Sequence, residues 1–218
     1  MKRVALLWRS SVGKKALTSL SGVLFFGWIC LHLLGNLTAF SGAAAMNGYA
    51  ASLRHAAPLL WLSRLVLFAA VALHVVSSLS LARAARASRP QSIARRPRRS
   101  STFASRSLRV GGPLLLGFLV FHLAHLTFGV GNPHFVPGRV YENVVSGLRS
   151  PGAATVYVVA AALVGLHLHH ALYAARTSLG IAPPSDGNAR RPVAVAIALA
   201  VAVGFASVPL AVAFGALR

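Results

Sequence analysis

The chain has 218 residues, of which 56% are hydrophobic, and its mean hydropathy is +0.68. This composition excludes an ordinary soluble domain, since long apolar runs are typical of membrane proteins. Lys and Arg number 22 against only 2 Asp and Glu, but these bases lie in links between apolar runs, which favours a multi-span membrane protein over a nucleic-acid-binding one. Cys30 is the single cysteine, which excludes a disulfide framework.

Five apolar stretches follow one another, and each exceeds the roughly 20 residues that a helix needs to cross a bilayer. Because lipid cannot satisfy open backbone groups, the sequence predicts an all-α integral membrane bundle of five transmembrane helices in a single domain, 1–218. We expect the first stretch to be both the insertion signal and a permanent span. The predicted spans are 18–40, 59–82, 110–131, 153–176 and 193–215.

The links between the spans differ in character. Residues 1–17 are short and basic, and residues 41–58 are small and weakly apolar, with room for a short helix lying in the membrane plane. Residues 83–109 hold nine arginines and three turn-type breaks, at Ser88-Arg89-Pro90, Pro97 and Ser100-Ser101. Pro and Gly at both ends of 132–152 predict a loop or surface helix, and 178–192 is a turn-rich link.

The basic residues indicate the orientation. Links on one side hold five, nine and three of them, whereas links on the other side hold one (Arg54) and two (Arg139 and Arg149). By the positive-inside rule the richer side is cytoplasmic. The N-terminus is therefore expected inside and the C-terminus outside.

Seven of the nine histidines lie within predicted spans, where ionisable residues are rare and usually functional. Two of these spans also carry a spare histidine: His125 shares a helix face with His122, and His170 shares one with His167. The residues alone leave the choice within each of these two pairs open. One histidine near mid-depth in each of the first four spans gives the principal set, which is His32, His74, His122 and His167.

Haem is the partner that suits these histidines best. Zinc, non-haem iron and proton pumps usually recruit carboxylates or cysteines, and no predicted span contains Asp or Glu. Haem iron needs only axial ligands such as imidazole. At 1.5 Å per residue, the histidines of spans one and three lie outside the centre of the membrane and those of spans two and four lie inside it. The sequence therefore predicts an outer haem held by His32 with His122 or His125, and an inner haem held by His74 with His167 or His170.

Three arginines are candidates for binding haem propionates or a quinone, because a guanidinium binds carboxylates in a bidentate fork. Arg83 and Arg176 each lie nine residues beyond an inner ligand, and Arg64 lies unusually deep at the outer end of the second span. The alternative for Arg83 and Arg176 is snorkelling to the lipid headgroups. His125 and His170 are secondary candidates for the same contacts.

Ordered motifs give the chain a resemblance to a known family. They are HLLGN (32–36), NGYA (47–50), the His74 span, FHLAHL (121–126), YEN (141–143) and GLHLHHAL with TSLG (165–180). In this order, with five spans, they resemble the cytochrome b subunit of succinate:quinone oxidoreductase, in its bacterial single-chain, five-helix, di-haem form.

The resemblance implies a membrane-anchor subunit of succinate dehydrogenase or fumarate reductase, respiratory complex II, in a bacterial cytoplasmic membrane. A flavoprotein and an iron–sulfur partner on the cytoplasmic side would handle the dicarboxylate of the tricarboxylic acid cycle. This chain would bind two haem b groups and pass electrons to menaquinone or ubiquinone. The resemblance also selects His122 over His125 and His167 over His170 as haem ligands. Two alternatives are a cytochrome b subunit of a formate dehydrogenase or hydrogenase, and, in a different class, a histidine-lined membrane transporter.

Overall fold

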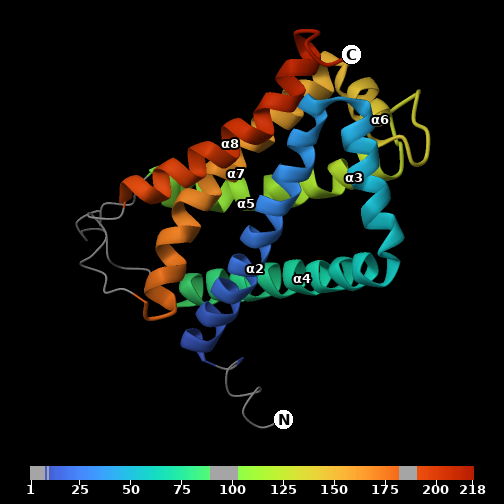
Figure 1. Ribbon diagram of the computed structural model, residues 1–218. Coiled ribbons are helices and arrows are strands. Elements are labelled where there is room, and N and C mark those ends of the chain that lie inside the picture. Colours follow the sequence, from blue (N-terminus) through green and yellow to red (C-terminus); the bar gives the residue numbers. More distant parts are fainter. Residues whose placement is uncertain (1–7, 9, 89–102, 182–190) are drawn as a thin grey trace.

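The fold was analysed in a computed structural model that describes residues 8, 10–88, 103–181 and 191–218 (Figure 1). The described residues form helices and no strand. Five helices are long and apolar enough to cross a membrane: Ser11–Ser41, Ala57–Ala87, Val110–Thr127, Pro151–Ser178 and Pro192–Ala213. The prediction of an all-α chain with five spanning helices is therefore confirmed. The elements are α2 (Ser11–Leu37), η1 (Thr38–Ser41), α3 (Ala43–His55), α4 (Ala57–Ala87), α5 (Phe103–His122), η2 (Leu123–Thr127), α6 (Val140–Leu148), α7 (Pro151–Ser178) and α8 (Arg191–Ala213).

Several boundaries differ from the predicted ones. The helix of the first span begins at Ser11 rather than 18. The helix of the second span continues to Ala87 rather than 82. The helix of the third span ends at Thr127 rather than 131, because Gly129 and Gly131 both adopt a φ of +75°. At Gly129 a Cβ atom would lie 2.5 Å from the Phe135 ring, so this turn depends on glycine. The breaks predicted within 89–102, and most of the link 178–192, lie outside the described residues.

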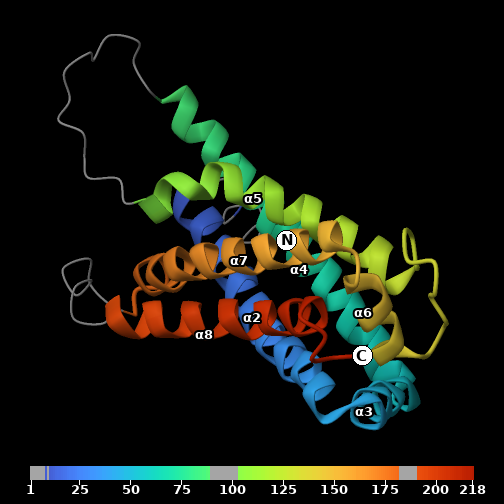
Figure 2. The ribbon, with the colours of Figure 1, turned by 90° about the horizontal axis from the view of Figure 1, so that it is seen from above.

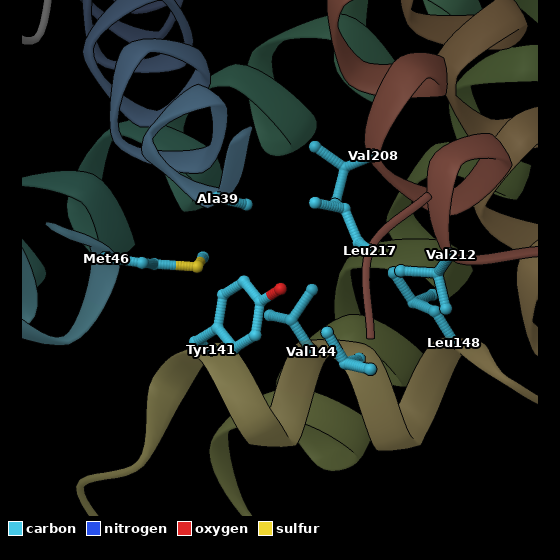
Figure 3. Packing of buried hydrophobic residues seen from close by; sticks show 9 residues of the cluster. Ala39, Met46, Tyr141, Val144, Leu148, Val208, Val212 and Leu217 are labelled. Atoms are coloured by element: carbon cyan, nitrogen blue, oxygen red, sulfur yellow. The ribbon is translucent and has the colours of Figure 1, made fainter. Parts of the chain in front are cut away.

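One end of the fold is closed by the two short helices α3 and α6, which occupy the links predicted at 41–58 and 132–152. A buried apolar cluster joins them to the C-terminal part of α8 and to η1, with Met46, Tyr141 and Val208 among its members (Figure 3). The Tyr141 backbone N–H donates to Asn47 Oδ1 at 3.0 Å, and Asn47 Nδ2 donates to Glu142 Oε2 at 2.9 Å. If the five spanning helices alternate in direction, α3, α6 and the C-terminal part of α8 are expected to lie at the same end of the bundle.

The histidine-bearing helices are joined by packing contacts through α2 and α7. Helix α2 packs against α4, α7 and α8, and α5 packs against α7. Helices α7 and α8 lie side by side in both views (Figures 1 and 2). Their close approach depends on Gly165, where a Cβ atom would lie 2.8 Å from Ala202 Cβ and 3.2 Å from the Ala198 carbonyl oxygen. This packing places α7 where residues of α2, α4 and α5 can reach it.

Candidate functional site

Histidines from four different spanning helices meet in two pairs. The ring centroids of His32 (α2) and His122 (α5) lie 5.8 Å apart, with an angle of 81° between the ring planes. The centroids of His74 (α4) and His167 (α7) lie 6.2 Å apart, with an angle of 59°. Among the described residues, no three His, Cys, Asp or Glu side chains come together as a metal-binding group. The arrangement therefore offers two sites with two imidazoles each.

The two pairs lie at different heights in the fold, and the spacing between them is the same along α2 as along α7. On α2, His32 belongs to the first pair, while Gly22 faces His74 of the second. On α7, Tyr157 contacts His122 of the first pair, while His167 belongs to the second. Both intervals are ten residues, or about 15 Å along a helix axis. The first pair lies toward the end closed by α3 and α6.

Aromatic rings surround the first pair. The Trp28 ring is stacked on His32, with centroids 4.7 Å apart and 12° between the planes. Phe205 of α8 lies 6.0 Å from His32, and Phe118 lies 5.8 Å from His122. These contacts fill the surroundings of the imidazoles with apolar surface, which excludes water from the site.

His125 lies beside the first pair but is engaged elsewhere. Its Nδ1 lies 3.1 Å from the Tyr157 hydroxyl, and its ring is stacked on Phe121 at 5.2 Å. His125 stands in the π-helical turn η2, which begins directly after His122. Such turns are rare and occur frequently at functional sites. The spare histidine of this span thus has its own partner, whereas His122 faces His32.

Hydrogen bonds orient His74 in the second pair. Its Nδ1 lies 3.1 Å from the Thr18 carbonyl oxygen and 3.3 Å from Ser21 Oγ. A carbonyl can only accept, so the hydrogen is on Nδ1 and the lone pair is on Nε2. Gly22 allows this close approach, because a Cβ atom there would already lie 3.4 Å from His74 Cε1. The fully buried Ser77 bonds to Thr18 Oγ1 at 2.7 Å and supports the same turn of α2.

Each pair also contains a buried ring nitrogen with unused hydrogen-bonding capacity. His122 Nδ1 and His167 Nδ1 are shielded from solvent and have no hydrogen-bond partner among the described residues. Buried polar atoms are normally satisfied, so an exception calls for an explanation. A neutral imidazole with an unengaged nitrogen is suited to ligating a metal ion.

The separations within the pairs fit a haem iron between two axial imidazoles. Two metal–nitrogen bonds of about 2.0–2.1 Å in line would place the ring centroids somewhat more than about 6 Å apart. The observed values, 5.8 and 6.2 Å, lie close to this distance and slightly below it. The residues present therefore fit haem, which takes its axial ligands from imidazole and its environment from apolar helices.

The secondary candidates are more dispersed. Arg64 is exposed on α4, with its guanidinium 4.8 Å above the Trp61 ring. Arg83 is exposed near the end of the same helix, while Arg176 is half-buried on α7. His170 is half-buried and follows His167 on α7, whereas the ring facing His74 is that of His167.

Several residues that shape the two sites were not identified from sequence. From the sequence, Trp28 is expected only to pack or to anchor at the membrane interface, and no role is predicted for Thr18, Ser21 or Tyr157. Their spacing held a signal: Trp28 precedes His32 by four residues, which places both on one face of a helix. Tyr157 and the hydroxyls of α2 reach histidines of other helices, so their partners depend on tertiary packing.

No protein-family model matches the chain, and neither does a curated protein or a solved structure.

Proposed function

We propose that this chain is the di-haem cytochrome b subunit that anchors a succinate dehydrogenase in the membrane and carries electrons to a quinone. The observation that carries the proposal is the meeting of four histidines, one from each of four spanning helices, in two pairs at 5.8 and 6.2 Å. The ordered motifs of the sequence add the choice of family. They supply the reaction, which the pairs alone do not specify.

In this proposal His32 and His122 hold the outer haem, and His74 and His167 hold the inner one. The haem groups supply one-electron chemistry. The chain holds each imidazole in place, excludes water and tunes the reduction potential through hydrogen bonds and burial. Thr18 and Ser21 keep the hydrogen of His74 on Nδ1, which leaves Nε2 for the iron. The spacing of about 15 Å along α2 and α7 would place the two haems one above the other across the membrane.

The remaining assignments follow from the same proposal. The basic links would face the cytoplasm of a bacterium, where the flavoprotein and iron–sulfur subunits would dock. Arg83 and Arg176 lie nine residues beyond His74 and His167, or about 13–14 Å at helical rise, and so would reach propionates of the inner haem. Arg64 lies over an exposed Trp61 ring at the other end of α4, which supports a role at the lipid interface more than a propionate contact.

Contacts between the motifs that carry the resemblance support the assignment as well. NGYA and YEN, which are far apart in the sequence, meet through the hydrogen bonds of Asn47 with Tyr141 and Glu142. Tyr49 of NGYA packs against Gly35 of HLLGN, where a Cβ atom would lie only 2.6 Å from its ring. Three of the motifs behind the resemblance therefore act together in closing one end of the bundle.

An absorption spectrum of the purified full chain tests the haem assignment. The dithionite-reduced protein is expected to show b-type bands, with about two haems per chain by pyridine haemochrome assay. Absence of b-type bands would contradict the proposal.

Purification of the chain together with its partner subunits tests the choice of family. Copurification of a flavoprotein with succinate dehydrogenase activity is expected. Copurification of a molybdenum or nickel enzyme would instead place the chain with formate dehydrogenases or hydrogenases.

A further inference from the structure

Trp28 makes the most parallel ring contact in either histidine pair. Its indole lies 4.7 Å from the His32 imidazole, with 12° between the planes. The two residues are four apart on α2, so their side chains leave the same face of the helix. Both side chains are half-buried. The stack is therefore part of the helix itself and does not depend on the approach of another span.

This stack restricts how the His32 ring can turn. Rotation about the Cβ–Cγ bond would drive an edge of the imidazole into the indole face, because stacked rings at this separation are in van der Waals contact. The other rings near His32 are inclined to it: Phe205 by 37° and His122 by 81°. They limit its position, while Trp28 limits its plane.

The second pair has a different device. His74 is held by hydrogen bonds from Nδ1 to Thr18 and Ser21, and its plane lies at 59° to that of His167. The near-perpendicular arrangement of imidazole planes occurs in the pair whose His32 stacks on Trp28. The difference in ring angle thus coincides with a difference in what holds the ring.

We propose that Trp28 is a positioning residue that fixes the imidazole plane of His32 nearly perpendicular to that of His122 across the iron of the outer haem. The inference rests on the proposed function, since it requires that haem be bound. The angle between two axial imidazole planes governs the splitting of the iron d orbitals. Perpendicular planes give a ferric low-spin signal of high anisotropy, with a larger maximum g value than parallel planes give.

Electron paramagnetic resonance of the oxidised full chain tests this role. The wild-type protein is expected to show two low-spin ferric signals, the more anisotropic one from the outer haem. Trp28→Leu removes the stacking ring, and the maximum g value of that signal should fall and its line should broaden, with the other signal unchanged. Trp28→Phe keeps an aromatic face and should restore the wild-type signal. Trp61→Leu is the matched control, because the Trp61 ring contacts Arg64 on an exposed face of α4.

The outcomes separate this inference from the proposed function. A wild-type chain without haem contradicts the function before any variant is made. A wild-type chain with two haems, and a Trp28→Leu variant with both signals unchanged, overturns the role of Trp28 and leaves the function standing. If Trp28→Leu loses the outer haem altogether, Trp28→Phe decides: a wild-type signal supports the role of the stack, and a displaced signal or loss of haem overturns it.

Discussion

The two histidine pairs have nearly the same separation but are held by different forces. At His32 and His122 the neighbours are the rings of Trp28, Phe118 and Tyr157. At His74 they are the carbonyl of Thr18 and the hydroxyl of Ser21, backed by Ser77. Aromatic contact fixes the plane of an imidazole but does not engage its N–H. A hydrogen bond fixes the tautomer and increases the basicity of the other nitrogen.

This difference has a consequence for electron transfer. A more basic axial ligand stabilises ferric iron and lowers the reduction potential, and hydrogen bonding around the ligand is one of the ways a protein tunes a haem. Of the two proposed haems, the one held by His74 has the hydrogen-bonded ligand. We therefore expect two haems of unequal potential, with the lower one at the His74 and His167 pair, although both lie in an apolar bundle.

The largest effects are expected from removing the paired imidazoles themselves. His122→Leu should reduce the haem content from two to about one per chain, because one axial ligand of the outer haem is lost. His125→Leu is the matched control on the next turn, and it should retain two haems, since the His125 ring is engaged by Tyr157. Pyridine haemochrome assay of the purified variants measures both. Loss of haem in His125→Leu with retention in His122→Leu would reverse the assignment.

The same test applies to the second pair. His167→Leu should remove one haem and His170→Leu should remove none, because the ring that faces His74 at 6.2 Å is that of His167. Redox titration should show that the haem left in His167→Leu is the one of higher potential. If the surviving haem has the lower potential, the link between the Thr18 and Ser21 contacts and haem potential is wrong.

A smaller effect is expected when the hydrogen bonding of the second pair is weakened. Ser21→Ala removes one of the two acceptors near His74 Nδ1, and the Thr18 carbonyl remains. The reduction potential of the inner haem should rise, because its ligand His74 becomes less basic, and that of the outer haem should stay unchanged. Ser207→Ala is the control, since that hydroxyl donates within its own helix, to the Gly204 carbonyl oxygen. Equal shifts in both haems would contradict a local effect.

How much of this could be predicted from the sequence differs between the fold and the site. The five spans were predictable because 20-residue apolar runs admit one backbone form in lipid. The end of the third span was placed too far along, since Val130 extends the apolar run beyond Gly129 and Gly131 while the backbone already turns there. Hydropathy depends on side chains alone, whereas the helix ends here because of the main-chain conformation of these two glycines.

The pairing of the histidines could be predicted from the sequence, but the contacts that support them could not. Depth in the membrane suggested which imidazoles share a height, and His32 with His122 and His74 with His167 do lie together. Thr18 and Ser21 reach His74 because Gly22 lets α4 approach α2 at one particular turn. Contacts of that kind depend on how two helices cross, and a single sequence does not specify the crossing.

The smallest effect is expected outside the spans, at the end of the fold nearest the first pair. Glu142 accepts from Asn47 Nδ2 and pairs with Arg139 at 2.8 Å. The hydrogen bond from Asn47, with further help from the Glu142 backbone N–H and Arg139, holds the pKa of this carboxyl below its usual 4.5. A carboxyl with a lowered folded-state pKa stabilises the fold above its unfolded pKa, and loses that contribution as pH falls through the folded value.

Glu142→Gln should therefore lower the Tm slightly at pH 7, where the carboxylate is charged, since Gln keeps an acceptor for Asn47 but has no charge for Arg139. The difference from the wild-type protein should shrink as the pH falls below 4.5. Thermal unfolding in detergent at pH 7 and pH 4 measures it, with Arg149→Gln as a control for loss of a surface charge in the same region. Because Glu142 contacts the short helices rather than a histidine, both haem signals should be unchanged. A shift of the outer haem alone would show that this end of the bundle also controls the first pair, and the two pairs would then differ in their coupling to the surface as well as in their supports.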